Sequence, residues 1–163
     1  MRQIKDPILF TLFLLVCGCA THGTSEVSVT TDKPALTKPQ ADKWQMMVGK
    51  WYGDQQTSEG GRKEWIDHRK NDGTYVIQFR ITSKDGEVQQ SVEAGEWGVS
   101  GPIYFSIFKA WVYDGRQDFS DATDPYNRDA YEIISLTEDA FEYLNYDSGN
   151  KYKTKRVSDA FSF

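Results

Sequence analysis

The sequence predicts an all-β fold, an eight-stranded up-and-down antiparallel barrel with a short N-terminal helix that closes one end. Two observations support this prediction. Turn signals rich in Gly, Asp and Asn recur at short intervals from residue 59 onward, and Asp-Gly between apolar runs is a strong hairpin signal. The segments between these turns either alternate apolar and polar residues or are apolar on both faces. A meander of eight such strands can close on itself and leave no open edge.

The short helix is expected over residues 41–49, directly before the first strand. Trp44, Met47 and Val48 are spaced so that they share one face of a helix, and Gly49 is a typical stop signal. The helix therefore enters the barrel at the end where the first strand begins.

The interior face of the barrel is assigned by alternation along each strand. In the strand 74–82 the face with Tyr75, Ile77 and Phe79 is the most apolar, so we orient it inward. The same rule gives the full set of candidate interior, ligand-binding residues: Tyr75, Ile77, Phe79, Phe105, Ile107, Trp111, Tyr131 and Tyr143. These side chains either line a pocket for an apolar or aromatic ligand or fill the core completely, and an eight-stranded barrel permits both.

One connection is much longer than the others. Residues 114–127 are acidic and show no periodicity, and long loops in compact domains are often functional. Because connections in an up-and-down barrel alternate between its ends, this loop is expected opposite the helix, at the mouth. Its aspartates do not have the spacing of a calcium-binding loop, so we interpret it as a solvated lid segment.

The N-terminal residues have the layout of an export signal. Arg2 and Lys5 precede an apolar run that is too short to span a bilayer, and small residues follow it. The run ends in Val16-Cys17-Gly18-Cys19, which resembles a bacterial lipobox. That resemblance implies cleavage before Cys19, acylation of Cys19 with chains such as palmitate, and a lipid anchor in the cell envelope. Since Ala20 rather than Asp follows Cys19, it favours the outer membrane, with the domain facing the periplasm.

Three segments follow from this organisation. Residues 1–18 are the expected lipoprotein signal peptide. Residues 19–40 are rich in Thr, Ser and Pro, with few large apolar side chains, and are expected to form a flexible, lipid-anchored tether. Residues 41–163 are expected to form the barrel domain.

A short helix followed by Gly49-x-Trp51 at the start of an eight-strand meander resembles the lipocalin-like proteins of the calycin superfamily. In that family the tryptophan closes the barrel floor and an arginine from the last strand packs on its face. The resemblance therefore implies that Gly49, Trp51 and Arg156 form the barrel closure here. The stretch Gly49–Gly53 also resembles the opening of nitrobindin-like haem barrels, but no histidine follows position 68 to bind the iron.

Several function classes are excluded or disfavoured by composition. A net charge of -5 argues against nucleic acid as a partner, because phosphate binding needs a basic face. His68 is the one histidine after residue 40, so the usual zinc site is not expected, and no catalytic nucleophile is marked. We expect no cofactor, no metal and no catalysis. The leading hypothesis is binding of a small hydrophobic or amphipathic molecule in the barrel. The alternative is an envelope protein–protein interaction module with a filled core.

Overall fold

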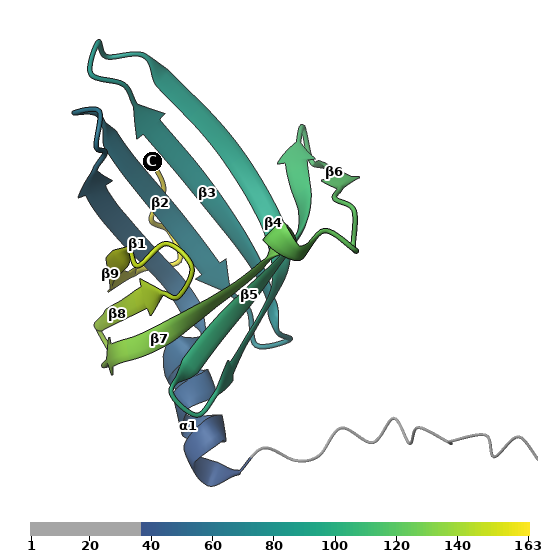
Figure 1. Cartoon of the computed structure of the whole chain (residues 1–163). Coiled ribbons are helices and arrows are strands. Elements are labelled where there is room, and N and C mark those ends of the chain that lie inside the picture. The colour runs from purple at the N-terminus through teal and green to yellow at the C-terminus, as the bar shows by residue number, and fades with distance from the viewer. Residues whose placement is uncertain (1–36) are drawn as a thin grey trace, which may run out of the picture. The chain divides into compact units, whose positions relative to one another are not determined.

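The computed structural model of the chain describes residues 37–163, and Figure 1 shows how its elements are arranged. The predicted signal peptide and Cys19 lie outside the described residues. In chain order the elements are α1 (Lys38–Met47), β1 (Gly49–Gln56), β2 (Arg62–Arg69), β3 (Thr74–Thr82), β4 (Val88–Ser100), β5 (Ile103–Tyr113), β6 (Arg116–Phe119), the 3-10 helix η1 (Pro125–Asn127), β7 (Arg128–Leu136), β8 (Ala140–Asn145) and β9 (Lys151–Val157).

Eight of these strands close into an antiparallel barrel, as predicted. The strand order is β4-β3-β2-β1-β9-β8-β7-β5, and a further pairing between β4 and β5 completes the ring. Six of the eight pairs are consecutive in the chain and are joined by short turns; the other two are β1–β9 and β5–β7. The closing pair β1–β9 brings Trp51 opposite Arg156.

The strand β6 lies outside the ring and corrects the prediction of an irregular 114–127 connection. It pairs with the end of β5, from Ala110↔Phe119 to Tyr113↔Arg116. The two residues between the strands, Asp114 and Gly115, both have positive φ, 50° and 73°. A two-residue hairpin turn of this kind requires that conformation and favours Asp-Gly.

The helix α1 begins earlier than predicted. Thr37 is its N-cap, and the backbone N–H of Thr37 donates to Oε1 of Gln40, as in a capping box. Residues 38–40 are therefore helical and do not belong to a tether. The helix ends at Met47, where the Val48 N–H still donates to the Trp44 carbonyl.

The two ends of the barrel differ. At the helical end, the Trp44 indole donates to Oδ1 of Asn71 in the β2–β3 turn and stacks on Trp97 at 4.1 Å. Lys43 donates to the Gly101 carbonyl in the β4–β5 turn. By alternation, the β1–β2, β3–β4, β5–β7 and β8–β9 connections lie at the opposite, open end, as expected (Figure 1).

The structure brings Gly49, Trp51 and Arg156 together at the helical end. Trp51 is 0% exposed, and its indole N–H donates to the Met47 carbonyl at 2.9 Å. The Arg156 guanidinium lies 4.3 Å from the centre of the Trp51 ring and donates to the Val48 carbonyl at 2.7 Å. Gly49 has φ +118°, and a Cβ there would stand 2.5 Å from Nη1 of Arg156. Only glycine allows this close approach without a shift of the arginine.

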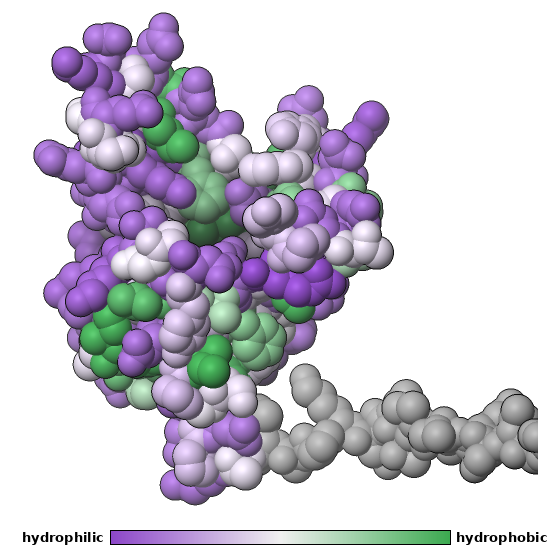
Figure 2. All heavy atoms as spheres, viewed as in Figure 1, coloured by the Kyte–Doolittle hydropathy of each residue, from purple (hydrophilic) through white to green (hydrophobic). Residues whose placement is uncertain are grey.

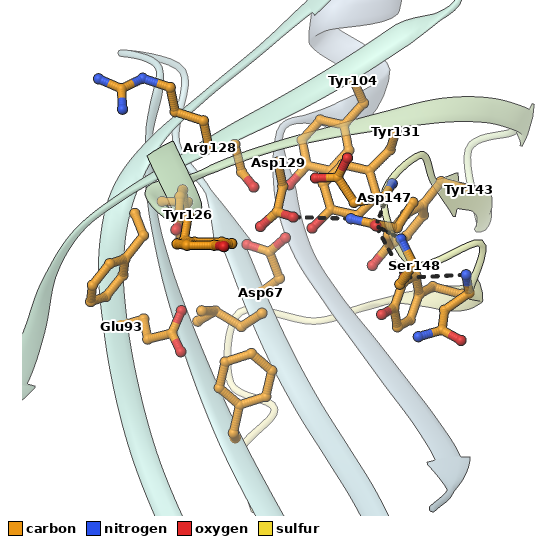
Figure 3. A pocket seen from close by; sticks show the side chains of 18 of the residues that line it. Asp67, Glu93, Tyr104, Tyr126, Arg128, Asp129, Tyr131, Tyr143, Asp147 and Ser148 are labelled. Carbon is orange, nitrogen blue, oxygen red and sulfur yellow. Dashed lines mark hydrogen bonds between the residues drawn. The ribbon is translucent and has the colours of Figure 1, made fainter. Parts of the chain in front are cut away.

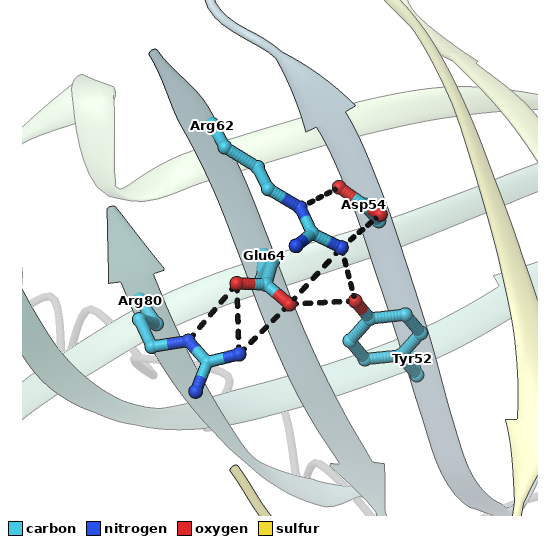
Figure 4. A network of polar contacts seen from close by, with 5 residues as sticks. All are labelled: Tyr52, Asp54, Arg62, Glu64 and Arg80. Carbon is cyan, nitrogen blue, oxygen red and sulfur yellow. Dashed lines mark hydrogen bonds and ion pairs between the residues drawn. The ribbon is translucent and has the colours of Figure 1, made fainter. Parts of the chain in front are cut away.

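A polar network covers the outer face of β1, β2 and β3 (Figure 4). Glu64 is buried at its centre and accepts hydrogen bonds from the Arg80 guanidinium at 2.9 Å and from the Tyr52 hydroxyl at 2.7 Å. Arg62 joins this cluster through a two-point contact with Asp54.

The C-terminal tail, residues 158–163, packs against the same outer face. Nζ of Lys50 donates to the Phe161 carbonyl at 3.1 Å, and the Phe161 ring meets Tyr52 edge-on at 5.3 Å. The last ring, Phe163, lies under the Arg80 guanidinium at 4.4 Å. The tail thus covers the network at Tyr52 and Arg80, while Arg62 and Asp54 remain exposed.

Candidate functional site

A cavity of about 750 Å³ opens at the end of the barrel opposite α1. Figure 2 shows it as a hollow with apolar side chains at its bottom, between the wall of long strands and the side that carries β6. The lining comes from β2–β5, η1, β7–β9 and the β8–β9 turn. Its volume lies within the range of about 300–1,000 Å³ that is typical of small-molecule sites.

Five of the eight predicted interior residues line this cavity. They are Tyr75, Ile77, Phe79, Tyr131 and Tyr143. Alternation placed them correctly because their strands have one clearly more apolar face.

The prediction is wrong for Phe105 and Ile107, which lie on the outer face of β5. The cavity is lined instead by Tyr104, Ser106 and Phe108. Phe105 is 37% exposed, and its ring covers Gly98, where a Cβ would stand 2.3 Å from the ring. Because β5 is apolar on both faces, alternation cannot select its inner face, and the packing of a ring over a glycine decides it.

Trp111 is on the inner side of β5 but is not among the residues that line the cavity. A register shift at Lys109 places Gly95 opposite Phe108 and Ala94 opposite Ala110. This bulge reverses the alternation, so Trp111 returns to the face of Phe108 and contacts its ring at 5.1 Å.

The bottom of the cavity is a packed layer of aromatic rings. Tyr104 stacks on Tyr131 at 5.0 Å, Phe141 on Tyr143 at 4.5 Å, and Tyr143 on Tyr152 at 5.3 Å. The half of the barrel near α1 is therefore filled, while the other half is hollow. The sequence left open a filled core and a lined pocket. The filled core describes the half of the barrel near α1, and the lined pocket describes the other half.

A buried ion pair lies at the boundary between these halves. Nη2 of Arg69 lies 2.7 Å from Oδ2 of Asp67, and both side chains are almost fully buried. The guanidinium also lies 4.7 Å from the centre of the Tyr104 ring and 5.1 Å from that of Phe141. Burial raises the pKa of Asp67, and the charge of Arg69 opposes that rise.

Sequence reasoning missed this pair, although a signal for it exists. Residues two apart in a strand share one face, so Asp67 and Arg69 must point to the same side as Trp65. An acid and a base on the inner face of a strand predict an internal ion pair.

Two further carboxylates enter the cavity (Figure 3). Asp129 on β7 accepts a hydrogen bond from the Asn145 side-chain amide at 3.0 Å. Glu93 on β4 is half-buried, and burial raises its pKa while the charge of Lys63 opposes the rise. Nζ of Lys63 lies over the Phe79 ring at 4.4 Å, and burial lowers the pKa of Lys63.

The segment before β7 forms part of the cavity wall. Pro125 and Tyr126 of η1 line it, and Tyr126 is 92% exposed. The carboxylates of this segment cap its own backbone: Oδ1 of Asp121 accepts from the Thr123 N–H, and Oδ1 of Asp124 accepts from the Tyr126 N–H. Within residues 37–163 no group of three or more His, Cys, Asp or Glu side chains is arranged to hold a metal ion.

The closed eight-strand ring, the helix at one end and the tryptophan–arginine closure form a small antiparallel β-barrel that is consistent with a lipocalin-like fold. No protein-family model matches the chain, and no curated protein matches it. Over its described part, the chain has no helix that is both long and apolar enough to cross a membrane.

The solved structures that are similar to the chain include the following two. One is a lipocalin-like protein from Bacteroides uniformis ATCC 8492, with 14% identity and a TM-score of 0.39 over 69% of this chain and 99% of that chain. The other is a de novo designed fluorescence-activating β-barrel, with 18% identity and a TM-score of 0.40 over 72% of this chain and 98% of that chain.

Proposed function

We propose that this protein is a non-catalytic binding protein that holds a small amphipathic molecule in the cavity at the open end of its barrel. The observation that supports this most directly is the cavity itself, with aromatic rings at its bottom and polar side chains toward its mouth. An amphipathic ligand would bury its apolar part against the rings and keep its polar part near the rim. A protein–protein module with a filled core is less well supported, because half of the barrel is hollow.

The absence of catalysis is part of the proposal. Asp67 pairs with Arg69, and Asp129 accepts a hydrogen bond from Asn145. These contacts orient the two cavity carboxylates, and neither contact activates a nucleophile.

The test uses the chain from Thr37 to Phe163, which contains the helix cap and every strand of the ring. Cooperative unfolding in urea is established first. The uncharged dye N-phenyl-1-naphthylamine is then titrated, because its fluorescence rises in an apolar site and it is not repelled by carboxylates. We expect saturable binding that decanol displaces. A folded domain that binds neither compound would refute the proposal.

A pair of matched variants assigns the dye to the cavity. Ser106 lines the cavity, whereas Ser135 is exposed on the outer side of β7. Ser106→Trp should fill part of the cavity and abolish dye binding, and Ser135→Trp should leave it unchanged. Equal binding by both variants would place the dye elsewhere.

We further propose that the domain is held by lipid on Cys19 at the outer membrane, facing the periplasm, with residues 20–37 as tether. Support comes from the lipobox-like sequence Val16–Cys19. In a bacterial host, incorporation of labelled palmitate should be lost in Cys19→Ser and retained in Cys17→Ser. Label retained in Cys19→Ser would contradict the assignment.

A further inference from the structure

The charges that line the cavity are unevenly distributed. Three carboxylates, those of Asp67, Glu93 and Asp129, reach it from β2, β4 and β7, and Asp147 lies in the turn at its rim. Figure 3 shows Asp67, Glu93 and Asp129 directed toward the same space. The three carboxylates also affect the pKa of one tyrosine. Burial raises the pKa of Tyr75, and the negative charges of Asp67, Glu93 and Asp129 raise it further.

The two cationic side chains in the lining make no ion pair with these carboxylates, although the charge of Lys63 partly offsets that of Glu93. Arg128 donates through Nη1 to the Asp124 carbonyl and through Nη2 to the Ala122 carbonyl, both at 2.9 Å, and Figure 3 shows its guanidinium directed away from the carboxylates. Lys63 lies over the Phe79 ring and makes no ion pair within the described residues.

Asp67 supplies an independent indication that a donor is missing from the cavity. Asp67 is 4% exposed, and Nη2 of Arg69 lies 2.7 Å from its Oδ2. The other oxygen, Oδ1, has no hydrogen-bond partner within residues 37–163. Nε, Nη1 and Nη2 of Arg69 also have none, but Arg69 is fully buried and is not among the residues that line the cavity, so a ligand there meets Asp67 and not the guanidinium. A buried carboxylate oxygen without a partner is costly, and a positively charged donor would relieve that cost.

The rings around these carboxylates suit a cation as well. Tyr126 and Tyr131 line the same cavity, and the faces of aromatic rings attract ammonium groups. Carboxylates combined with tyrosine faces recognise a positive charge on an otherwise apolar molecule.

Resting on the proposed function, we propose that the cavity selects a cationic amphipathic ligand, an aliphatic or aromatic ammonium compound whose head group binds among Asp67, Glu93 and Asp129. The apolar part of the ligand packs on the tyrosine layer below. A bound ammonium group also offsets the burial that raises the pKa of Asp67 and Glu93.

Three compounds with the same ten-carbon tail test this inference: decylamine, decanol and decanoate. Each is used at pH 7 to displace N-phenyl-1-naphthylamine from the domain 37–163. We expect decylamine to act at concentrations at least ten-fold lower than decanol or decanoate. Equal displacement by decylamine and decanol would overturn the inference and leave the proposed function intact. Preferential displacement by decanoate would also overturn it and would point to Lys63. A domain that binds no dye and none of the three compounds would refute the proposed function itself.

Two neutralising variants and a matched control locate the head group. Glu93→Gln and Asp129→Asn each keep the shape of the side chain, whereas replacing Asp67 would leave Arg69 buried without its partner. Each variant should weaken decylamine several-fold and leave decanol unchanged. Asp85→Asn, in the exposed β3–β4 turn, makes the same charge change away from the cavity and should alter neither compound. Unchanged decylamine binding in both cavity variants would contradict the assignment.

Discussion

Replacing Arg156 by methionine should destabilise the barrel by removing two kinds of contact at once. The cation 4.3 Å from the Trp51 ring is worth about 0.5–2 kcal/mol. The guanidinium also donates to the carbonyls of Met46 and Val48 at the end of α1, and a hydrogen bond from a charged donor is worth about 1.5–3 kcal/mol. Water can reach these carbonyls in the variant because Arg156 is half-buried, so we expect a net loss of about 2–4 kcal/mol.

A double-mutant cycle separates the ring contact from the carbonyl contacts. Arg156→Met, Trp51→Leu and the double variant are unfolded in urea and followed by far-UV circular dichroism. Arg156→Met removes the hydrogen bonds to the helix carbonyls whether residue 51 is Trp or Leu. The interaction energy of the cycle therefore reports the contact between the Trp51 ring and the Arg156 cation alone, about 0.5–2 kcal/mol.

The control cycle pairs Arg156→Met with Phe141→Leu. Phe141 meets Trp51 edge-on at 6.1 Å, and within the described residues no ring, ion-pair or hydrogen-bond contact joins Phe141 to Arg156. The coupling of this pair should therefore be smaller than that of the Trp51 pair. An interaction energy for the Trp51 pair that equals the control would refute the reasoning. Arg156 would then act only as a cap for the helix carbonyls.

Two further predictions concern β1 and β2. A Cβ at Gly53 would stand 2.1 Å from the Trp65 ring, so Gly53→Ala should cost about 1–3 kcal/mol in urea unfolding through overpacking, and an unchanged midpoint would contradict the packing described. The hydrogen bonds from Arg80 hold the pKa of Glu64 below its usual range. The folded-state pKa lies below the unfolded value of about 4.3, so the carboxylate stabilises the fold above that pH and loses this effect as the pH falls through the folded-state value. The stability difference between wild type and Glu64→Gln should therefore be larger at pH 7 than at pH 3, and a constant difference would count against the network.

Much of the fold could be predicted from the sequence because Asp-Gly and Asn-Asp-Gly mark several of the turns between its strands. The same signal was present at Asp114-Gly115 and was overlooked within a segment read as irregular, so β6 was missed. The start of α1 was missed for a similar reason. Thr37 and Gln40 form a capping pair, but they lie in a stretch whose composition suggested a tether.

The site was predicted where one strand face is clearly apolar and missed where it is not. The inward positions of Tyr75 and Ile77 follow from alternation. The inner face of β5 depends on Gly98 in the neighbouring strand β4 and on the bulge at Lys109. Such contacts join residues far apart in the chain and leave no local pattern. The carboxylates of the cavity were also missed, because an acidic residue on an inner face contradicts the rule used to find that face.

The strand β6 changes the pairing partner of β5 toward the open end of the barrel. β5 pairs with β7 only from Ile103 to Ile107, and beyond the bulge its edge pairs with β6 instead. The ladder between β5 and β7 therefore ends at Ile107, near the cavity. This four-residue strand and its turn are separate from the aromatic half of the barrel. We therefore expect changes in the length of this hairpin to alter the mouth of the cavity and to leave the packing of the aromatic half unchanged.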